Sequence, residues 1–249
     1  MSVIWKNKYA YISTPEPIFT FIIAAGGSGT RMGGVYKPLS DICGKPMLAY
    51  SLEAFEKSGF VRQIVITAPE DRIKEVESAA KEYSGKVKCV VPGGSTRAES
   101  VKAGFRAAFD CKEDITPFVA VHDAARPLVS QEIINNVCFG TVRYGAAVAA
   151  LKVRDALKHT LTNGFIDDDI DRENVWQMQT PQAFDTDIYH TALATLSDDV
   201  FRAAPDDAAL VTAAGFKVLC VDGSVTNFKV TYPEDLEMAR AIISARKSD

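Results

Sequence analysis

The stretch FTFIIAAGG, residues 19–27, decides the fold of this chain of 249 residues. Seven consecutive apolar or β-branched residues are typical of a strand buried on both faces, and the glycines end that strand in a loop. A segment with helical spacing follows, with Leu48, Leu52 and Phe55 on one face and Gly59 as its stop signal. A buried strand, a glycine loop and an amphipathic helix in this order indicate an α/β fold.

The same alternation continues along the chain. Further strands are expected at 63–68, 86–94, 117–127, 145–153, 217–223 and 227–231, and further helices at 70–83, 97–109, 131–143, 185–196, 206–216 and from Pro233. This pattern predicts a doubly wound, mostly parallel α/β sheet with helices on both of its faces.

One segment, residues 152–179, breaks the alternation. It mixes short β-like pieces with the acidic turn NGFIDDDIDREN and is too long for an ordinary connection. We therefore expect a single domain over residues 19–249 with an inserted β-arm at about 152–179, preceded by an N-terminal extension over residues 1–18. Apolar groups such as Trp176 cannot be buried by a lone arm, which favours a two-fold homodimer.

Composition argues against several classes of function. The net charge is −4, so a broad basic face for nucleic acid is not expected. No apolar run is long enough to span a membrane, and residues 1–18 lack the apolar core of a secretory leader. The five cysteines are scattered without a C-x-x-C pair, which favours a cytoplasmic location over a zinc site or a disulfide framework.

The loop from Ala24 to Lys37 lies at the carboxyl end of the first strand, where ligands of such folds bind. Its glycines let backbone N–H groups approach a phosphate chain, and Arg31 and Lys37 add two long cations. A P-loop would end in Lys-Ser or Lys-Thr, and a dinucleotide fingerprint would have glycine in place of Met32. The arrangement favours a triphosphate ligand, with a plain glycine-rich turn as the alternative.

Three further motifs are expected near the same edge of the sheet. In VHDAARP, Asp123 could hold Mg²⁺ and Arg126 could clamp a phosphate, or the two could pair with each other. In GGSTRAESV, Ser95 and Ser100 offer hydrogen bonds to a base, or the turn caps the helix that follows. In TNFKVT, Lys229 lies among apolar neighbours and needs a counter-charge, either a substrate phosphate or a structural aspartate.

Other polar residues have simpler structural interpretations. His122 is expected to pack or to form hydrogen bonds within the core. Asp206 and Asp207 are expected to cap the helix that follows them. On the residues alone, Arg172 is expected to be an exposed side chain of the arm.

Together these motifs resemble the 2-C-methyl-D-erythritol 4-phosphate cytidylyltransferase family. The likeness runs from Phe21 to Arg246 and rests on AAGGSGTRMG, GKPMLAYSL, GGSTRAESV, VHDAARP, VRDALK, VWQMQTPQAF and NFKVTYPEDL, in the family's order and spacing. It implies a nucleotide-diphospho-sugar transferase-like fold. It also implies an enzyme that transfers CMP from CTP to 2-C-methyl-D-erythritol 4-phosphate with the help of Mg²⁺.

The resemblance also implies roles for individual residues. Arg31, Lys37 and Lys229 match the cations that stabilise the transition state at the reacting phosphates. Asp123 matches the metal ligand. The positions that match the nucleotide site are Ala24, Ala25, Gly26, Gly27, Gly94, Ser95 and Ser100.

The arm has an implied role as well. In the family it embraces a second subunit and completes the partner's acceptor site. The resemblance therefore implies that Arg126 and Arg172 hold the acceptor phosphate, and that Arg172 acts on the neighbouring subunit of a homodimer.

Three other functions remain as alternatives. Ala156 stands where the family has a threonine that reaches the substrate, so ribitol 5-phosphate is the alternative acceptor. GSGTRM and KPL also resemble sugar-1-phosphate nucleotidyltransferases, which is a weaker match. A catalytically silent nucleotide-binding protein is the non-enzyme alternative. The joint presence of four residues argues against it: Arg31, Lys37, Asp123 and Lys229.

Overall fold

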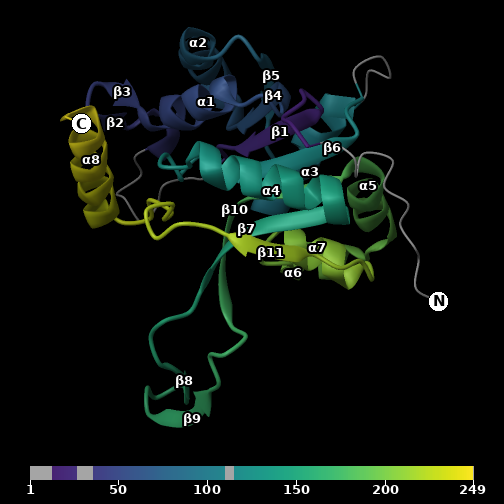
Figure 1. The fold of residues 1–249 in the computed structure, drawn as a ribbon, viewed down its shortest axis with the longest axis vertical. Coiled ribbons are helices and arrows are strands. Elements are labelled where there is room, and N and C mark those ends of the chain that lie inside the picture. The colour runs from purple at the N-terminus through teal and green to yellow at the C-terminus, as the bar shows by residue number, and fades with distance from the viewer. Residues whose placement is uncertain (1–12, 27–35, 110–114, 249) are drawn as a thin grey trace.

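The computed structural model describes residues 13–26, 36–109 and 115–248. A seven-stranded sheet crosses the molecule in the order β11-β7-β10-β6-β1-β4-β5 (Figure 1). β5, β4, β1 and β6 are parallel, and β7 is parallel to β11, whereas β10 is antiparallel to both β6 and β7. The predicted doubly wound, mostly parallel sheet is confirmed. Its strands are β1 (Phe19–Ala24), β4 (Val61–Ala68), β5 (Val87–Pro92), β6 (Phe118–Asp123), β7 (Ala146–Lys152), β10 (Trp176–Asp185) and β11 (Leu219–Asp222).

Helices cover both faces of the sheet, because successive side chains of a strand point to opposite sides. Phe21 and Ile23 of β1 enter one core with α1, α2 and α4, whereas Ile22 enters the other with α3, α5 and α7. Within the described ranges, no helix is both long and apolar enough to cross a membrane. The helices are α1 (Met47–Lys57), α2 (Ile73–Tyr83), α3 (Arg97–Phe109), α4 (Gln131–Tyr144), α5 (Thr186–Thr195), α6 (Asp198–Ala203), α7 (Asp207–Ala213) and α8 (Pro233–Ser248).

The predicted strand at residues 227–231 is wrong, because this segment has an irregular backbone. Its apolar and β-branched residues imitate a strand, but its backbone bonds to loops instead of to a neighbouring strand. The N–H of Val230 donates to the carbonyl of Ala125 at 2.8 Å. The side chain of Val230 is buried in a small cluster with Ile42 and Ile243 of α8. The segment therefore follows the carboxyl edge of the sheet instead of joining it.

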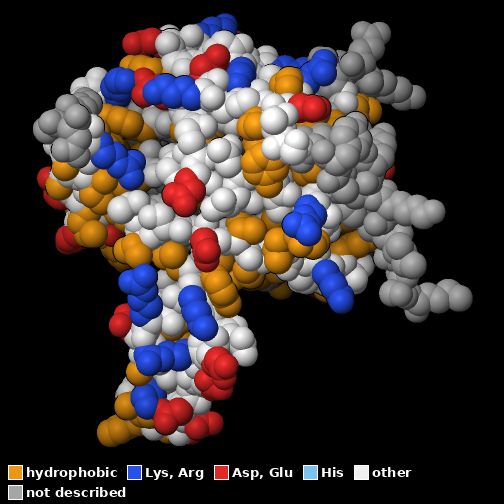
Figure 2. All heavy atoms as spheres, viewed as in Figure 1, with side chains coloured by type: hydrophobic (Ala, Val, Ile, Leu, Met, Phe, Trp, Pro, Cys, Tyr) orange, Lys and Arg blue, Asp and Glu red, His pale blue; other side chains and the backbone are white. Residues whose placement is uncertain are grey.

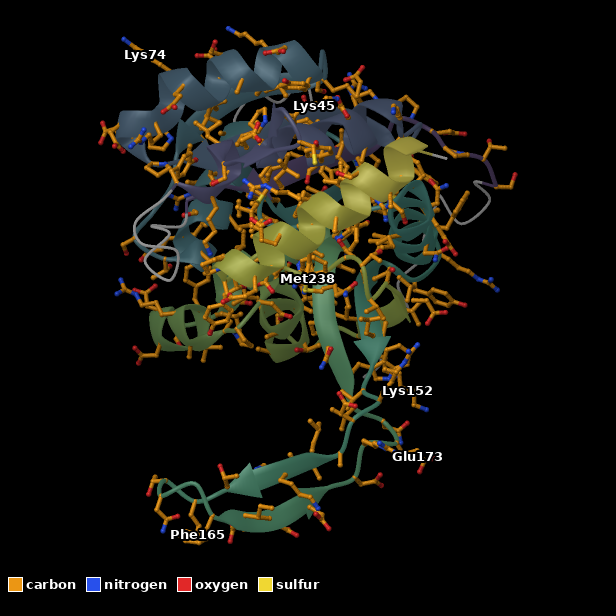
Figure 3. The ribbon with its side chains drawn as sticks, turned by 90° about the vertical axis from the view of Figure 1, so that its left-hand side faces the viewer. Lys45, Lys74, Lys152, Phe165, Glu173 and Met238 are labelled. Carbon is orange, nitrogen blue, oxygen red and sulfur yellow. The ribbon has the colours of Figure 1, made fainter. Side chains whose placement is uncertain are left out.

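The segment that breaks the α/β alternation forms a projecting arm. β8 (Leu157–Thr160) and β9 (Ile166–Ile170) pair as an antiparallel hairpin that stands away from the body (Figure 1). Phe165 lies at its far end, and Lys152 and Glu173 lie near its root (Figure 3). The arm leaves the sheet at the end of β7 and returns as β10, since Trp176 pairs with Lys152.

Lys86 ties the end of α1 to the start of β5. Its Nζ donates to the carbonyl oxygens of Phe55, Glu56 and Ser58, at 3.3, 2.7 and 2.8 Å. A cation there satisfies carbonyls that have no partner within the helix and complements the helix dipole. This contact lies at the amino ends of β4 and β5, at the opposite edge of the sheet from the carboxyl ends.

Candidate functional site

The predicted binding segments meet at the carboxyl edge of the sheet. Ala24 and Asp123 are register partners at the ends of the neighbouring strands β1 and β6. The N–H of Ala25 donates to the carbonyl of Thr67, near the end of β4, at 2.8 Å. The N–H of Gly93, just after β5, donates to the carbonyl of Ala68 at the end of β4 at 2.8 Å. The loops after β1, β5 and β6 therefore start at the same edge of the sheet, which is where open α/β sheets bind their ligands.

Ser100 joins the two glycine loops. It is only 3% exposed, and its hydroxyl accepts from the N–H of Gly94 at 3.1 Å and donates to the carbonyl of Thr96 at 2.8 Å. A Cβ at Gly93 would lie 2.8 Å from Ser100 Oγ, and one at Gly26 would lie 3.2 Å from it. A side chain at Gly93 would therefore displace Ser100, and one at Gly26 would crowd it, because both backbones close on one buried serine.

The second glycine loop also contains a helix cap. Thr96 Oγ1 accepts from the N–H of Glu99 at 3.1 Å, and Glu99 Oε2 accepts from the N–H groups of Ser95 and Thr96 at 3.0 and 3.2 Å. These are the reciprocal bonds of a capping box at the start of α3. The capping interpretation therefore holds, and it leaves the predicted contact between Ser95 and a nucleotide as a prediction.

Asp123 is the centre of the site. Arg97 Nε donates to its Oδ1 at 2.9 Å, and Lys229 Nζ donates to its Oδ2 at 2.8 Å. Arg126 Nε lies 3.8 Å from the same Oδ2, and this nitrogen has no hydrogen-bond partner among the described residues. Burial alone would raise the pKa of the Asp123 carboxyl, but Arg97, Lys229 and Arg126 together hold that pKa well below its usual range. Asp123 is therefore ionised and surrounded by cations.

Arg97 and Asp207 are site residues that sequence reasoning missed. Arg97 Nη1 donates to Asp207 Oδ2 at 2.7 Å, and Tyr189 Oη donates to Asp207 Oδ1 at 2.6 Å. The predicted cap is made by Asp206 alone, whose Oδ1 accepts from the N–H of Ala209 at 2.9 Å. The capping role predicted for Asp207 is wrong, because its side chain is buried against Arg97 instead. The only signal for Arg97 was its place in the first turn after a glycine loop.

Amide side chains hold the loop that carries Lys229. Gln179 Nε2 donates to the carbonyl of Ser224 at 2.8 Å, and its Oε1 accepts from Asn227 Nδ2 at 3.1 Å. Arg126 Nη1 donates to the carbonyl of Asn227 at 2.8 Å. Lys37 Nζ approaches the same segment from the other side, 3.5 Å from the carbonyl oxygen of Val230. The predicted cations Lys37, Arg126 and Lys229 thus converge on one stretch of backbone.

Arg172 is a predicted site residue that does not join this cluster. Arg172 lies exposed on the arm, where its Nη1 bonds to the carbonyl of Arg154. Arg31 and Gly27 lie outside the described residues. Their predicted roles stay predictions.

His122 has the structural role that the sequence predicted for it. The carbonyl of Arg126 can only accept, so His122 Nε2 carries the proton and donates to it at 3.2 Å. Nδ1 of the neutral ring then accepts from the Thr180 hydroxyl, 3.0 Å away, and Thr180 Oγ1 in turn accepts from the N–H of Asp123. Burial lowers the pKa of His122 to about 3. The imidazole is therefore neutral at physiological pH.

We predict that His122 does not titrate above about pH 4. Its folded pKa lies below its ordinary value of 6.5, so the folded state binds fewer protons than the unfolded state between these two values. Stability contributed by neutral His122 is then complete above about pH 6.5 and is lost as the pH falls toward 3. The ring C–H resonance of His122, assigned with His122→Gln, should keep its neutral shift down to about pH 4. A midpoint near pH 6.5 would show that the imidazole is open to solvent.

A doubly wound sheet with a glycine loop and cations at its carboxyl edge defines the class of nucleotide-binding α/β proteins. The family model of 2-C-methyl-D-erythritol 4-phosphate cytidylyltransferase (IspD) matches residues 19–245. The chain belongs to this family, as the sequence motifs predicted.

Individual relatives and solved structures agree with this assignment. The 2-C-methyl-D-erythritol 4-phosphate cytidylyltransferase of Pelotomaculum thermopropionicum is 39% identical over 91% of this chain and 94% of its own length. The bifunctional enzyme IspD/IspF of Desulfotalea psychrophila is 35% identical over 91% of this chain, which spans 57% of that longer protein. The crystal structure of the Thermus thermophilus cytidylyltransferase matches with a TM-score of 0.70 and 30% identity, covering 90% of this chain and 98% of that one.

Proposed function

We propose that this chain transfers CMP from CTP to 2-C-methyl-D-erythritol 4-phosphate, releasing pyrophosphate and giving 4-diphosphocytidyl-2-C-methyl-D-erythritol on the non-mevalonate route to isoprenoids. One observation carries the proposal beyond family membership. Arg97, Arg126 and Lys229 surround the carboxylate of Asp123 at the carboxyl edge of the sheet, and Arg97 also pairs with Asp207. Cations outnumber carboxylates there, which suits a triphosphate and a phosphate monoester together.

The reaction needs positioning and charge stabilisation more than proton transfer. An oxygen of the acceptor phosphate forms a bond to the α-phosphorus of CTP, and the bond from that phosphorus to the pyrophosphate oxygen breaks. The acceptor phosphate is already anionic, so no general base is required, and the buried neutral His122 is given no part in the step. Lys37 and Lys229, with Arg31, stabilise the charge that spreads over the phosphate oxygens.

We further propose that Mg²⁺ arrives with the triphosphate. Among the described residues, no group of three His, Cys, Asp or Glu side chains is arranged to hold a metal. Mg²⁺ is commonly bound by one or two carboxylates together with substrate phosphates. Each Asp123 oxygen accepts one bond, from Arg97 or Lys229, and has a second lone pair, so Asp123 would serve as the single protein carboxylate in such a set. When bound, the ion would neutralise charge on the departing pyrophosphate.

We expect CTP to be preferred over ATP and GTP by about 10²-fold or more in kcat/KM. The physical reason is the closure of both glycine loops on Ser100, which leaves a small frame suited to a pyrimidine. Pyrophosphate release would be measured with each nucleotide and 2-C-methyl-D-erythritol 4-phosphate. Comparable turnover with ATP would contradict the prediction that the space beside Ser100 excludes a purine.

The same assay separates the alternative functions. Release that depends on ribitol 5-phosphate or on a sugar 1-phosphate would reassign the acceptor. Binding of CTP without pyrophosphate release for any acceptor would identify a catalytically silent nucleotide-binding protein.

We also propose a homodimer in which the arms interlock. Leu161, Phe165 and Ile166 are 48%, 71% and 66% exposed at the far end of the arm, where hydrophobic side chains gather (Figure 2). A second copy offering the same surface would cover them in an isologous contact. Arg172, exposed on the arm, would then reach the acceptor phosphate of the neighbouring subunit.

Mixing two inactive variants tests the arm. We expect Arg172→Ala and Lys37→Ala to be inactive separately and to recover about a quarter of wild-type activity after subunit exchange, because half of the dimers are mixed and each has one intact site. Exchange without recovery would place Arg172 in its own subunit or outside the site. Sedimentation as a monomer at micromolar concentration would contradict the dimer itself.

A further inference from the structure

A series of side-chain contacts leads from the core to the site, buried at Tyr189 and partly buried from Arg97 to Lys229. It runs from Tyr189 of α5 to Asp207 of α7, then to Arg97 of α3, then to Asp123 at the end of β6, and finally to Lys229. We infer that Arg97, fixed by Asp207 and Tyr189, is a positioning residue that sets where Asp123 holds Lys229. The inference rests on the proposed cytidylyl transfer, in which Lys229 contacts the reacting phosphates.

The end of this series of contacts that lies farthest from the site, formed by Tyr189 and Asp207, is held in one orientation. Tyr189 is fully buried, and the side chain of Asp207 is 1% exposed. Both oxygens of Asp207 are bonded, one to the Tyr189 hydroxyl and one to Arg97. A buried carboxylate with both oxygens bonded has one orientation, so it is a fixed anchor for the guanidinium.

Because Asp207 fixes the guanidinium of Arg97, that guanidinium in turn fixes the position of the Asp123 carboxylate. Its Nη1 bonds to Asp207 while its Nε bonds to Asp123, so one planar group spans two carboxylates. A guanidinium has a fixed fork of donors, whereas a lysine ammonium is a single point charge on a flexible stem. Lysine at this position would keep the charge and lose the simultaneous contact.

Lys229 depends on this arrangement because packing does not hold it. Its side chain is 40% exposed, while the Asp123 side chain is 9% exposed. The loop around Lys229 fixes the backbone, and the bond to Asp123 directs the ammonium. A shift of about 1 Å in a catalytic group can cost about 10²-fold in rate.

The first test is the kinetic coupling between Arg97 and Lys229. We expect Arg97→Lys to lower kcat by about 10- to 10²-fold with little change in KM for CTP. In a Lys229→Ala background, the same substitution should cost less than about 3-fold, because the group that it positions is already gone. A kcat within 2-fold of wild type, or a full and independent loss in both backgrounds, would overturn the inference.

Matched variants separate positioning from general stability. Arg106→Lys makes the same change at an exposed position of α3, and Lys86→Met removes the contact at the end of α1. Both should keep wild-type kcat at a temperature where they are folded. Tyr189→Phe removes only the hydroxyl bonded to Asp207 and should lower kcat in the same direction as Arg97→Lys, by less. Loss of kcat in Lys86→Met equal to that in Arg97→Lys would indicate a stability effect only.

A second readout does not depend on turnover. Without substrate, acylation of the Lys229 amine can be followed by peptide mass spectrometry. We expect it to be about 2- to 5-fold faster in Arg97→Lys and in Tyr189→Phe than in the wild type and Arg106→Lys, the range for loss of a partly exposed ion pair. Unchanged or slower labelling would overturn the positioning role. If the wild-type protein released no pyrophosphate, the proposed function would fail, while this labelling would still decide the inference.

Discussion

Asp123→Asn will lower kcat for cytidylyl transfer by about 10³-fold or more, the larger of two effects expected at the site. The substitution removes the charge that holds Lys229 at 2.8 Å and Arg97 at 2.9 Å. It also replaces the one protein carboxylate proposed for Mg²⁺ with an amide, which is a poorer ligand for a hard cation. Steady-state pyrophosphate release across a Mg²⁺ titration would measure both losses.

The same variant should also be less stable. Arg97, Arg126 and Lys229 keep their charges and lose their shared counter-charge, and breaking a buried pair from one side costs about 3 kcal/mol. Asp185→Asn is a matched control, because Asp185 caps α5 and asparagine caps helices equally well. Wild-type activity and Mg²⁺ dependence in Asp123→Asn would leave Asp123 a structural role only.

Local patterns in the sequence predicted the sheet well. The hydrophobic periodicity that distinguishes a buried strand from a helix depends only on residues close together in the sequence. β1, β4, β6 and β7 could therefore be expected from their own segments. The carboxyl edge followed from that topology, because parallel strands end on the same side. This is why Asp123, Arg126 and the glycine loops could be placed together without a structure.

Contacts between distant segments could not be predicted in the same way. Arg97 and Asp207 are 110 residues apart. Asp207 had a sufficient local explanation in an acidic pair that caps a helix, and nothing in the residues around Arg97 pointed to a distant carboxylate. The segment 227–231 has the β-branched pattern of a strand, but packing against α8 and a bond to Ala125 decide its course. Tertiary contacts override local propensity at such positions.

Lys229→Met will lower kcat by about 10²- to 10³-fold, as expected when a cation is removed from the developing charge at the α-phosphorus. KM for CTP should change much less, because in the proposed reaction Lys37 and Arg31 still bind its phosphates. Lys217→Met, at an exposed position beside β11, is the matched control and should retain wild-type turnover.

Stability will distinguish this variant from Asp123→Asn. The Lys229 side chain is 40% exposed, and Asp123 keeps its bond to Arg97 after the lysine is gone. The free energy of unfolding should therefore fall by less than about 1 kcal/mol, the usual limit for an exposed ion pair. Urea unfolding of the two variants beside wild type makes the comparison. A loss of stability in Lys229→Met as large as that in Asp123→Asn, with kcat retained, would mean that Lys229 serves as a counter-charge for Asp123 and takes no part in the transfer.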